Sequence, residues 1–141
     1  MPALDLDMLI AFTNKADKHH KIADTFFFLI KIGKIRNVYL PVSVAIEYEL
    51  VHKSRGISEE QIAYELSMFK KFPNLHHYPL NLDILILASK IRRTYNISYF
   101  DSIHAATAIK IDKQIISTDD TFDKIENLKR LDPYQYVIKF E

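Results

Sequence analysis

Apolar runs typical of buried strands alternate with helical patterns along this chain. The strand-like runs occupy five short segments: Ala3–Leu6, Val38–Pro41, His76–Tyr78, Gln114–Ser117 and Tyr136–Phe140. Helical patterns occupy the segments between them: Met8–Phe12, His19–Lys34, Ser43–His52, Ser58–Phe72, Asn81–Tyr95 and Ser98–Ile111. This alternation predicts an α/β fold, a three-layer α/β/α sandwich with a mainly parallel central sheet. The last strand-like run alternates apolar and polar residues, which predicts an edge strand.

Two serines are expected to begin helices. Ser58 opens the sequence Ser-Glu-Glu-Gln, which fits a capping box, and Ser43 precedes the helix that contains Glu49. Within the helix His19–Lys34, three consecutive phenylalanines include Phe27, which we expect to point outward. An exposed aromatic side chain would indicate a surface for a partner.

Length and composition limit the number of domains and exclude several classes of site. The chain has 141 residues, 48% of them hydrophobic, which predicts a single domain over residues 1–141 with one core. The absence of cysteine excludes disulfides, thiolate zinc sites and cysteine nucleophiles. No apolar run approaches the roughly 20 residues that span a bilayer, so we expect a soluble, cytoplasmic protein without membrane contact.

Charge is almost balanced over the whole chain. Nineteen Lys and Arg residues against eighteen Asp and Glu give a formal net charge of +1. This value argues against nucleic-acid binding by bulk electrostatics, so any RNA affinity must come from local patches.

Four acidic residues fall where a parallel sheet collects its ligands, beyond the carboxyl ends of the strands. Asp5 ends the first strand, Glu49 lies in the helix after the second, Asp101 is in the first turn of its helix, and Asp119 follows Gln114–Ser117. Carboxylates gathered in one cleft repel one another, and a divalent cation removes that repulsion. Ligands with oxygen alone favour Mg²⁺ or Mn²⁺, which suit phosphodiester hydrolysis.

Four segments of the chain, in order, resemble the motifs of a PIN domain. Ala3–Phe12 resembles the family's opening, and Ser43–Leu50 is similar to the segment that holds its glutamate. Ser98–Ala108 resembles the helix with the D-x-x-h-A-A core, and Ile115–Phe122 resembles the T/S-x-D-x-x-F turn that follows. The resemblance implies a PIN-like fold and the activity of a ribonuclease, many relatives being VapC-type toxins of toxin–antitoxin pairs.

The resemblance assigns roles to particular residues. It implies Asp5, Glu49, Asp101 and Asp119 as the catalytic and metal-binding acids, with Ser117 as a supporting hydroxyl. The family usually has Thr or Ser where this chain has Leu6, and Asn or Ser where it has Asp7, which adds a possible ligand. Glu47 lies two residues before Glu49, about 200° around the helix, so only one of the two can face the site; we favour Glu49.

Partners are implied in the same way. The resemblance implies a homodimer and an antitoxin protein that docks a helix in an apolar groove. Single-stranded RNA is the expected substrate, and Mg²⁺ or Mn²⁺ the expected cofactor. Five basic residues are candidates for binding RNA phosphates: Lys53, Arg55, Lys90, Arg92 and Arg93.

Simpler interpretations remain open for several of these residues. Asp101 could complete a capping box with Ser98, and Asp119 could be a plain turn residue. His104, three residues after Asp101, is interpreted as a partly buried helix residue.

Two other functions also remain open. Asp5 and Asp7 also fit the D-x-D motif of a haloacid-dehalogenase-type phosphatase, in which Asp5 would be the nucleophile. The chain could instead be a non-catalytic PIN-like module that binds RNA or a partner.

Overall fold

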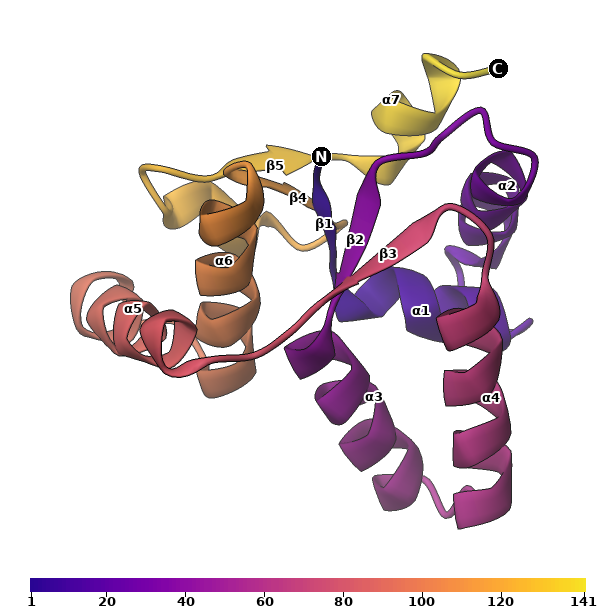
Figure 1. Ribbon diagram of the computed structural model, residues 1–141, viewed down its shortest axis with the longest axis horizontal. Coiled ribbons are helices and arrows are strands. Elements are labelled where there is room, and N and C mark those ends of the chain that lie inside the picture. The colour runs from indigo at the N-terminus through magenta and orange to yellow at the C-terminus, as the bar shows by residue number, and fades with distance from the viewer.

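A computed structural model describes all residues of the chain, 1–141, and places helices on both sides of a central sheet (Figure 1). The strands are β1 Ala3–Leu4, β2 Val38–Pro41, β3 Leu75–Tyr78, β4 Gln114–Ile116 and β5 Lys129–Leu131. The helices are α1 Leu6–Thr13, α2 His20–Lys31, α3 Val42–Ser54, α4 Glu59–Lys71, α5 Leu82–Tyr95, α6 Tyr99–Ile111, the 3-10 helix η1 Asp120–Lys124 and α7 Pro133–Ile138.

The sheet has five strands in the order β3-β2-β1-β4-β5, and all of its strand pairs are parallel. The shortest strand, β1, lies in the centre, where Ala3 pairs with both Tyr39 of β2 and Ile115 of β4. The chain moves from β1 to one edge of the sheet through β2 and β3, and fills the other edge with β4 and β5. The expected α/β sandwich with a parallel sheet is therefore confirmed.

Alternating side chains of the strands enter two different cores. Leu4 and Ile116 face a core shared with α1, α2, α3, α4 and α7. Ala3 and Ile115 face a second core shared with α5, α6 and η1. Figure 1 shows α5 and α6 on one side of the sheet and α1, α2 and α4 on the other. Strands buried on both faces lack a polar side, which explains their continuously apolar sequences.

The helix α3 begins two residues earlier than the sequence predicts. Ser58 caps α4 as expected, because its side chain accepts a hydrogen bond from the backbone N–H of Gln61. The N-cap of α3, however, is Pro41, and Ser43 is a buried residue inside the helix. The hydroxyl of Ser43 is therefore free for another partner.

The prediction of an edge strand at the end of the chain is wrong. Residues Pro133–Ile138 form helix α7, in which Asp132 accepts a capping hydrogen bond from the backbone N–H of Tyr134. An aspartate followed by proline at the first helical position is a strong helix start, and it overrides the alternating pattern. The fifth strand is the short β5 instead, which the sequence analysis missed because its exposed and half-buried residues form no apolar run.

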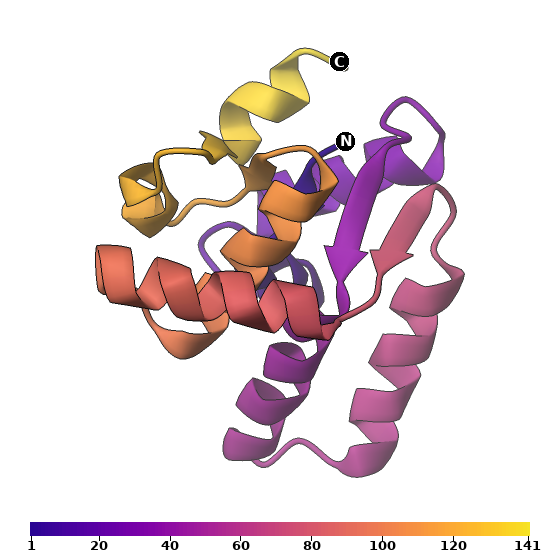
Figure 2. The same ribbon diagram turned by 60° about the vertical axis from the view of Figure 1, so that its left-hand side comes forward.

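A buried polar network ties α3 to its neighbours. Glu65 of α4 accepts hydrogen bonds from the Tyr48 hydroxyl and from Nε2 of His52, and Tyr48 also bonds to Thr13 of α1. Figure 2 shows α3 and α4 side by side as an antiparallel pair that extends beyond the sheet. The network fixes the helix that follows β2, which is the helix that carries both Glu47 and Glu49.

None of the helices combines the length and the apolar character needed to cross a membrane.

Candidate active site

The candidate site lies between β1 and β4, where the order in which the chain adds strands to the sheet reverses. Asp5 directly follows β1, and Ser117, Thr118 and Asp119 directly follow β4, the strand paired with β1. Such a switch point leaves an opening beyond the carboxyl ends of the two strands, because their connections run to opposite sides. Helix α6 precedes β4 and packs against it, so its first turn, with Asp101, reaches the same edge.

Carboxylates line a small cavity at this edge, with a volume of about 310 Å³. Its acidic residues are Asp5, Asp7, Asp17, Glu47, Asp101 and Asp119. His19 and Arg55 are the basic side chains of its wall. The structure therefore brings Asp5, Asp101 and Asp119 together, as the sequence analysis expects.

Helix α3 presents Glu47 to the cavity, whereas the sequence analysis favours Glu49 for this place. Glu47 lines the cavity, and its Oε1 accepts a 2.7 Å hydrogen bond from Nε2 of His104. Glu49 is not among the lining residues; its charge acts on Lys53, one turn further along α3. Tyr48, which lies between the two glutamates, is buried in the core, and its packing sets which side of α3 faces the cavity.

The segment after β4 holds both aspartates of the first motif. The Ser117 hydroxyl donates a 2.7 Å hydrogen bond to Oδ2 of Asp5, and both groups are buried. The backbone N–H and the hydroxyl of Thr118 both donate to Oδ2 of Asp7. Ser117 thus provides the hydroxyl that Leu6 does not, and Thr118 is a supporting residue that the sequence analysis missed.

Burial raises the pKa values of three of these acids, and repulsion between carboxylates adds to the shift of two of them. Burial raises the pKa of Asp5 well above its usual value, and the charges of Asp7 and Asp101 raise it further. Burial also raises the pKa of Asp7, against the hydrogen bonds from Thr118. The pKa of Asp101 is raised by burial and then by Asp119 and Glu47. The site therefore disfavours its own negative charges as long as no cation is bound.

Asp101 and Asp119 differ in their part in helix capping. Ser98 is the N-cap of α6, but no side-chain capping bond forms there, so the capping-box interpretation of Asp101 lacks its main contact. Asp119 caps η1 through Oδ1, which accepts a 2.9 Å hydrogen bond from the backbone N–H of Thr121. Asp119 is therefore a turn residue as well as part of the cavity wall.

The donor chemistry of the cavity fits a hard divalent cation. All acidic groups offer oxygen, and Oδ1 of Asp7 is buried without any hydrogen-bond partner. No three of the acids are close enough, in this conformation, to hold one ion together. One ion held by three of them would therefore require some of these side chains to rotate.

The candidate basic residues fall into separate groups. Arg55 lines the acidic cavity, whereas Lys53 pairs with Glu59 at 2.9 Å on the surface. Lys90, Arg92 and Arg93 belong to α5 and do not line the cavity. Arg92 is also engaged within the chain, because it donates to Ser102 and lies over the ring of Tyr99.

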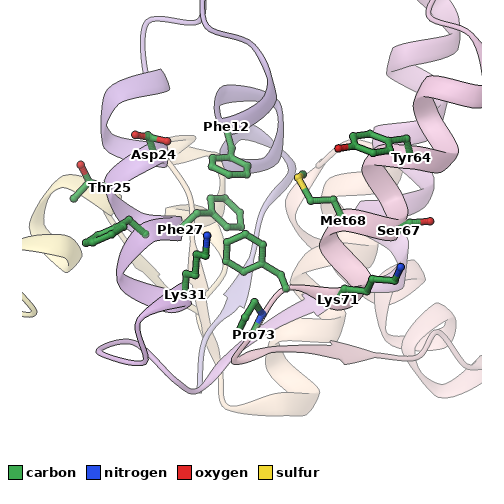
Figure 3. A pocket seen from close by; sticks show the side chains of 12 residues that line it. Phe12, Asp24, Thr25, Phe27, Lys31, Tyr64, Ser67, Met68, Lys71 and Pro73 are labelled. Atoms are coloured by element: carbon green, nitrogen blue, oxygen red, sulfur yellow. The ribbon is translucent and has the colours of Figure 1, made fainter.

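A larger apolar groove lies between α2 and α4, with a volume of about 840 Å³ (Figure 3). Phe12 and Phe27 form its floor, and Tyr64 and Met68 of α4 face them from the opposite wall. Phe27 is fully buried, so the expectation that it points outward is wrong. The outward ring belongs to Phe28, which also lines the groove and is 58% exposed.

Comparison with known proteins assigns the family. The model of the PIN domain matches residues 4–128 of the chain. The chain belongs to the PIN domain family. This match covers all the acidic residues of the cavity and does not support the phosphatase interpretation of Asp5 and Asp7. No curated protein matches the sequence of the chain.

Solved PIN structures share its fold at low sequence identity. VapC20 of Mycobacterium tuberculosis, described as a sarcin–ricin loop cleaving toxin, is 16% identical, with a TM-score of 0.72 over 87% of this chain and 93% of the other. VapBC2 of Rickettsia felis, solved with a promoter DNA fragment, is 16% identical, with a TM-score of 0.70 over 92% and 96%. VapBC-1 of nontypeable Haemophilus influenzae is 20% identical, with a TM-score of 0.66 over 94% and 97%.

Proposed function

We propose that this PIN domain is a metal-dependent endoribonuclease that cleaves single-stranded RNA, and the toxin of a toxin–antitoxin pair. The observation that carries the proposal is the convergence of Asp5, Glu47, Asp101 and Asp119 on one cavity at the switch point of the sheet. The structural likeness to VapC toxins supports the same conclusion.

Each acid has a distinct place in this proposal. Asp5 and Asp101 would hold the principal Mg²⁺ or Mn²⁺, because both line the cavity and a cation there would offset the negative charges that surround each of them. Glu47 and Asp119, which line the same cavity, would complete the set, and Asp7 would offer its unpaired Oδ1 as a further oxygen. When bound, such a cation lowers the pKa of an attacking water and stabilises charge on the phosphate oxygens.

The chain's own residues position these groups. Ser117 donates to Oδ2 of Asp5 and so restricts the rotation of that carboxylate. Thr118 holds one oxygen of Asp7 in the same way. The burial of these contacts limits the number of side-chain rotamers, so the oxygens are oriented before substrate binds.

Digestion of a single-stranded RNA with and without divalent cations tests this function. Cleavage is expected with Mg²⁺ or Mn²⁺, and it should fall to background in EDTA, because the donor set holds only oxygen ligands. Activity that survives EDTA would exclude the mechanism. RNA binding without cleavage, equal with and without Mg²⁺, would instead show a non-catalytic PIN module.

Arg55 is the residue placed best to contact an RNA phosphate, because it alone of the predicted basic residues lines the acidic cavity. Arg55→Ala is expected to weaken RNA binding and to lower the slope of log affinity against log salt by about 1, through the loss of one phosphate contact. Arg93→Ala, an exposed change on α5, is the matched control. If the wild type and Arg55→Ala show equal slopes of log affinity against log salt, Arg55 does not contact an RNA phosphate.

The groove between α2 and α4 is proposed as the docking site of an antitoxin helix. Its apolar floor of phenylalanines would take the apolar face of a helix, and Lys31 and Lys71 at its wall would favour acidic residues on that helix. Phe28→Asp is expected to abolish co-purification of an antitoxin protein co-expressed with this chain. Retention of that partner by the variant would contradict the assignment.

A homodimer is proposed from the exposed apolar side chains of α3. Val42, Ile46 and Leu50 recur every four residues and are all exposed, so they form a stripe along one side of the helix. Sedimentation velocity should show a dimer for the wild type and a monomer for Ile46→Asp. If the wild type sediments as a monomer at micromolar concentration, the proposal of a homodimer is wrong.

A further inference from the structure

Glu47 is attached to a buried histidine that the proposed mechanism does not use. His104 of α6 is fully buried, and its two ring nitrogens contact two side chains of α3. Its Nε2 lies 2.7 Å from Oε1 of Glu47, and its Nδ1 lies 2.8 Å from the hydroxyl of Ser43. Ser43 is itself buried, so the three residues form a chain of hydrogen bonds from the core to the cavity.

The direction of these bonds follows from their chemistry. An ionised carboxylate only accepts hydrogen bonds, so Nε2 of His104 must carry a proton and donate it to Glu47. At the other nitrogen, the Ser43 hydroxyl serves as donor to a neutral ring or as acceptor from a charged one. Nε2 is a donor in both cases, so the contact with Glu47 is kept whichever charge the ring carries.

The position of His104 links two of the acids. Asp101 precedes it by three residues on α6, so the same face of the helix bears one acid and the group that holds the other. Glutamate has three side-chain torsions, and His104 provides the only side-chain hydrogen bond that restrains them. A ligand held in one rotamer loses less conformational entropy when it binds a cation.

We propose that His104 is a positioning residue that orients the Glu47 carboxylate toward the cation, and that Ser43 fixes the ring of His104 for this task. This inference rests on the proposed function, since it concerns the same metal site. No chemical step falls to His104, because its ring contacts Glu47 and Ser43 and does not line the cavity.

Titration of the protein with Mn²⁺, followed by the electron paramagnetic resonance signal of free Mn²⁺, tests this role. His104→Leu is expected to weaken Mn²⁺ binding by about 10- to 100-fold, the usual cost of removing a group that orients a metal ligand. His104→Gln should retain affinity close to that of the wild type, because its amide N–H can still donate to Glu47. Ser43→Ala should give an intermediate loss.

A double-mutant comparison separates positioning from general damage to the fold. In a Glu47→Ala background, His104→Leu should cause no further loss of Mn²⁺ affinity, because the group that it orients is already absent. Additive losses, or equal losses for His104→Leu and His104→Gln, would overturn the proposal. If His104→Leu does not fold, Ser43→Ala gives the same comparison with a smaller change in the core.

A measurement without metal keeps this inference distinct from the proposed function. Nitrogen-15 NMR of the metal-free protein should show a slowly exchanging proton on Nε2 of His104, whose chemical shift changes in Glu47→Gln. A proton on Nδ1 alone would contradict the inference. A wild-type protein that shows the Nε2 signal but binds no Mn²⁺ would contradict the metal-dependent function and the positioning role, while leaving the hydrogen-bonded chain intact.

Discussion

Glu47→Gln is expected to reduce the rate of RNA cleavage on the order of 100-fold or more, because a metal-site carboxylate contributes several kcal/mol and each 1.4 kcal/mol is about tenfold in rate. The glutamine keeps the side chain's length, and its carbonyl can still accept the hydrogen bond from His104. The loss therefore reports the missing charge in the cavity and not a rearranged α3.

Glu49→Gln is the matched control for this prediction, since it removes the same charge from the same helix two residues away. It should change the rate by no more than about twofold, as surface substitutions usually do. Single-turnover digestion of one RNA by both variants at saturating Mg²⁺ makes the comparison. If Glu49→Gln lowers the rate of cleavage more than Glu47→Gln does, Glu49 is the acid of the site, as the sequence alone suggests. Helix α3 would then be rotated differently in the active protein.

Asp101→Asn is expected to abolish RNA cleavage and yet to raise the melting temperature of the metal-free protein. The acid carries a raised pKa because of burial and the nearby charges of Asp119 and Glu47, so its ionised form is disfavoured in the folded state. Asparagine has the same shape without the charge. A gain of about 1 kcal/mol corresponds to about 3–4 °C in Tm for a domain of this size.

The pH dependence of this difference follows from the direction of the shift. A carboxyl whose pKa is raised by folding destabilises the protein above that raised pKa, and the penalty disappears as the pH falls toward the ordinary value. The variant lacks this titration at position 101. The difference in Tm between Asp101→Asn and the wild type should therefore be greatest near neutral pH and should shrink with acidification.

Calorimetry with and without Mg²⁺ completes the test of Asp101. Mg²⁺ binds the folded state, so it should raise the Tm of the wild type more than that of the variant. Asp83→Asn, an exposed acid in the first turn of α5, is the matched control and should leave both the Mg²⁺ shift and cleavage unchanged. If Asp101→Asn behaves like this control, Asp101 does not belong to the metal site.

The sequence alone predicted the fold class and three of the four acids that we propose for the metal site. Strands buried on both faces, such as Gln114–Ile116, appear as apolar runs that need no knowledge of their neighbours. Asp5 and Asp119 follow such strands directly, and Asp101 stands in the first turn of a well-defined helix. Their convergence follows from the geometry of a parallel sheet, which brings the carboxyl ends of its strands to one edge.

Two local signals disagree at the end of the chain. The alternation of apolar and polar residues favours a strand, whereas Asp132 and Pro133 favour the start of a helix. The alternation in Tyr136–Phe140 is equally compatible with a short helix that buries Val137 against the first core. Asp132 and Pro133 start that helix, but their effect depends on where the preceding strand ends. β5 is too short and too exposed to be recognised without the sheet that it joins.

The choice between Glu47 and Glu49 was decided by tertiary structure alone. Both glutamates lie on the same helix, and their sequence contains no signal for the helix's rotation about its axis. That rotation is set by Tyr48, whose hydroxyl bonds to Glu65 of α4 and Thr13 of α1, and by Ser43, whose hydroxyl meets His104 of α6. These partners come from distant parts of the chain, so the contacts that turn Glu47 toward the cavity exist only once the helices have packed.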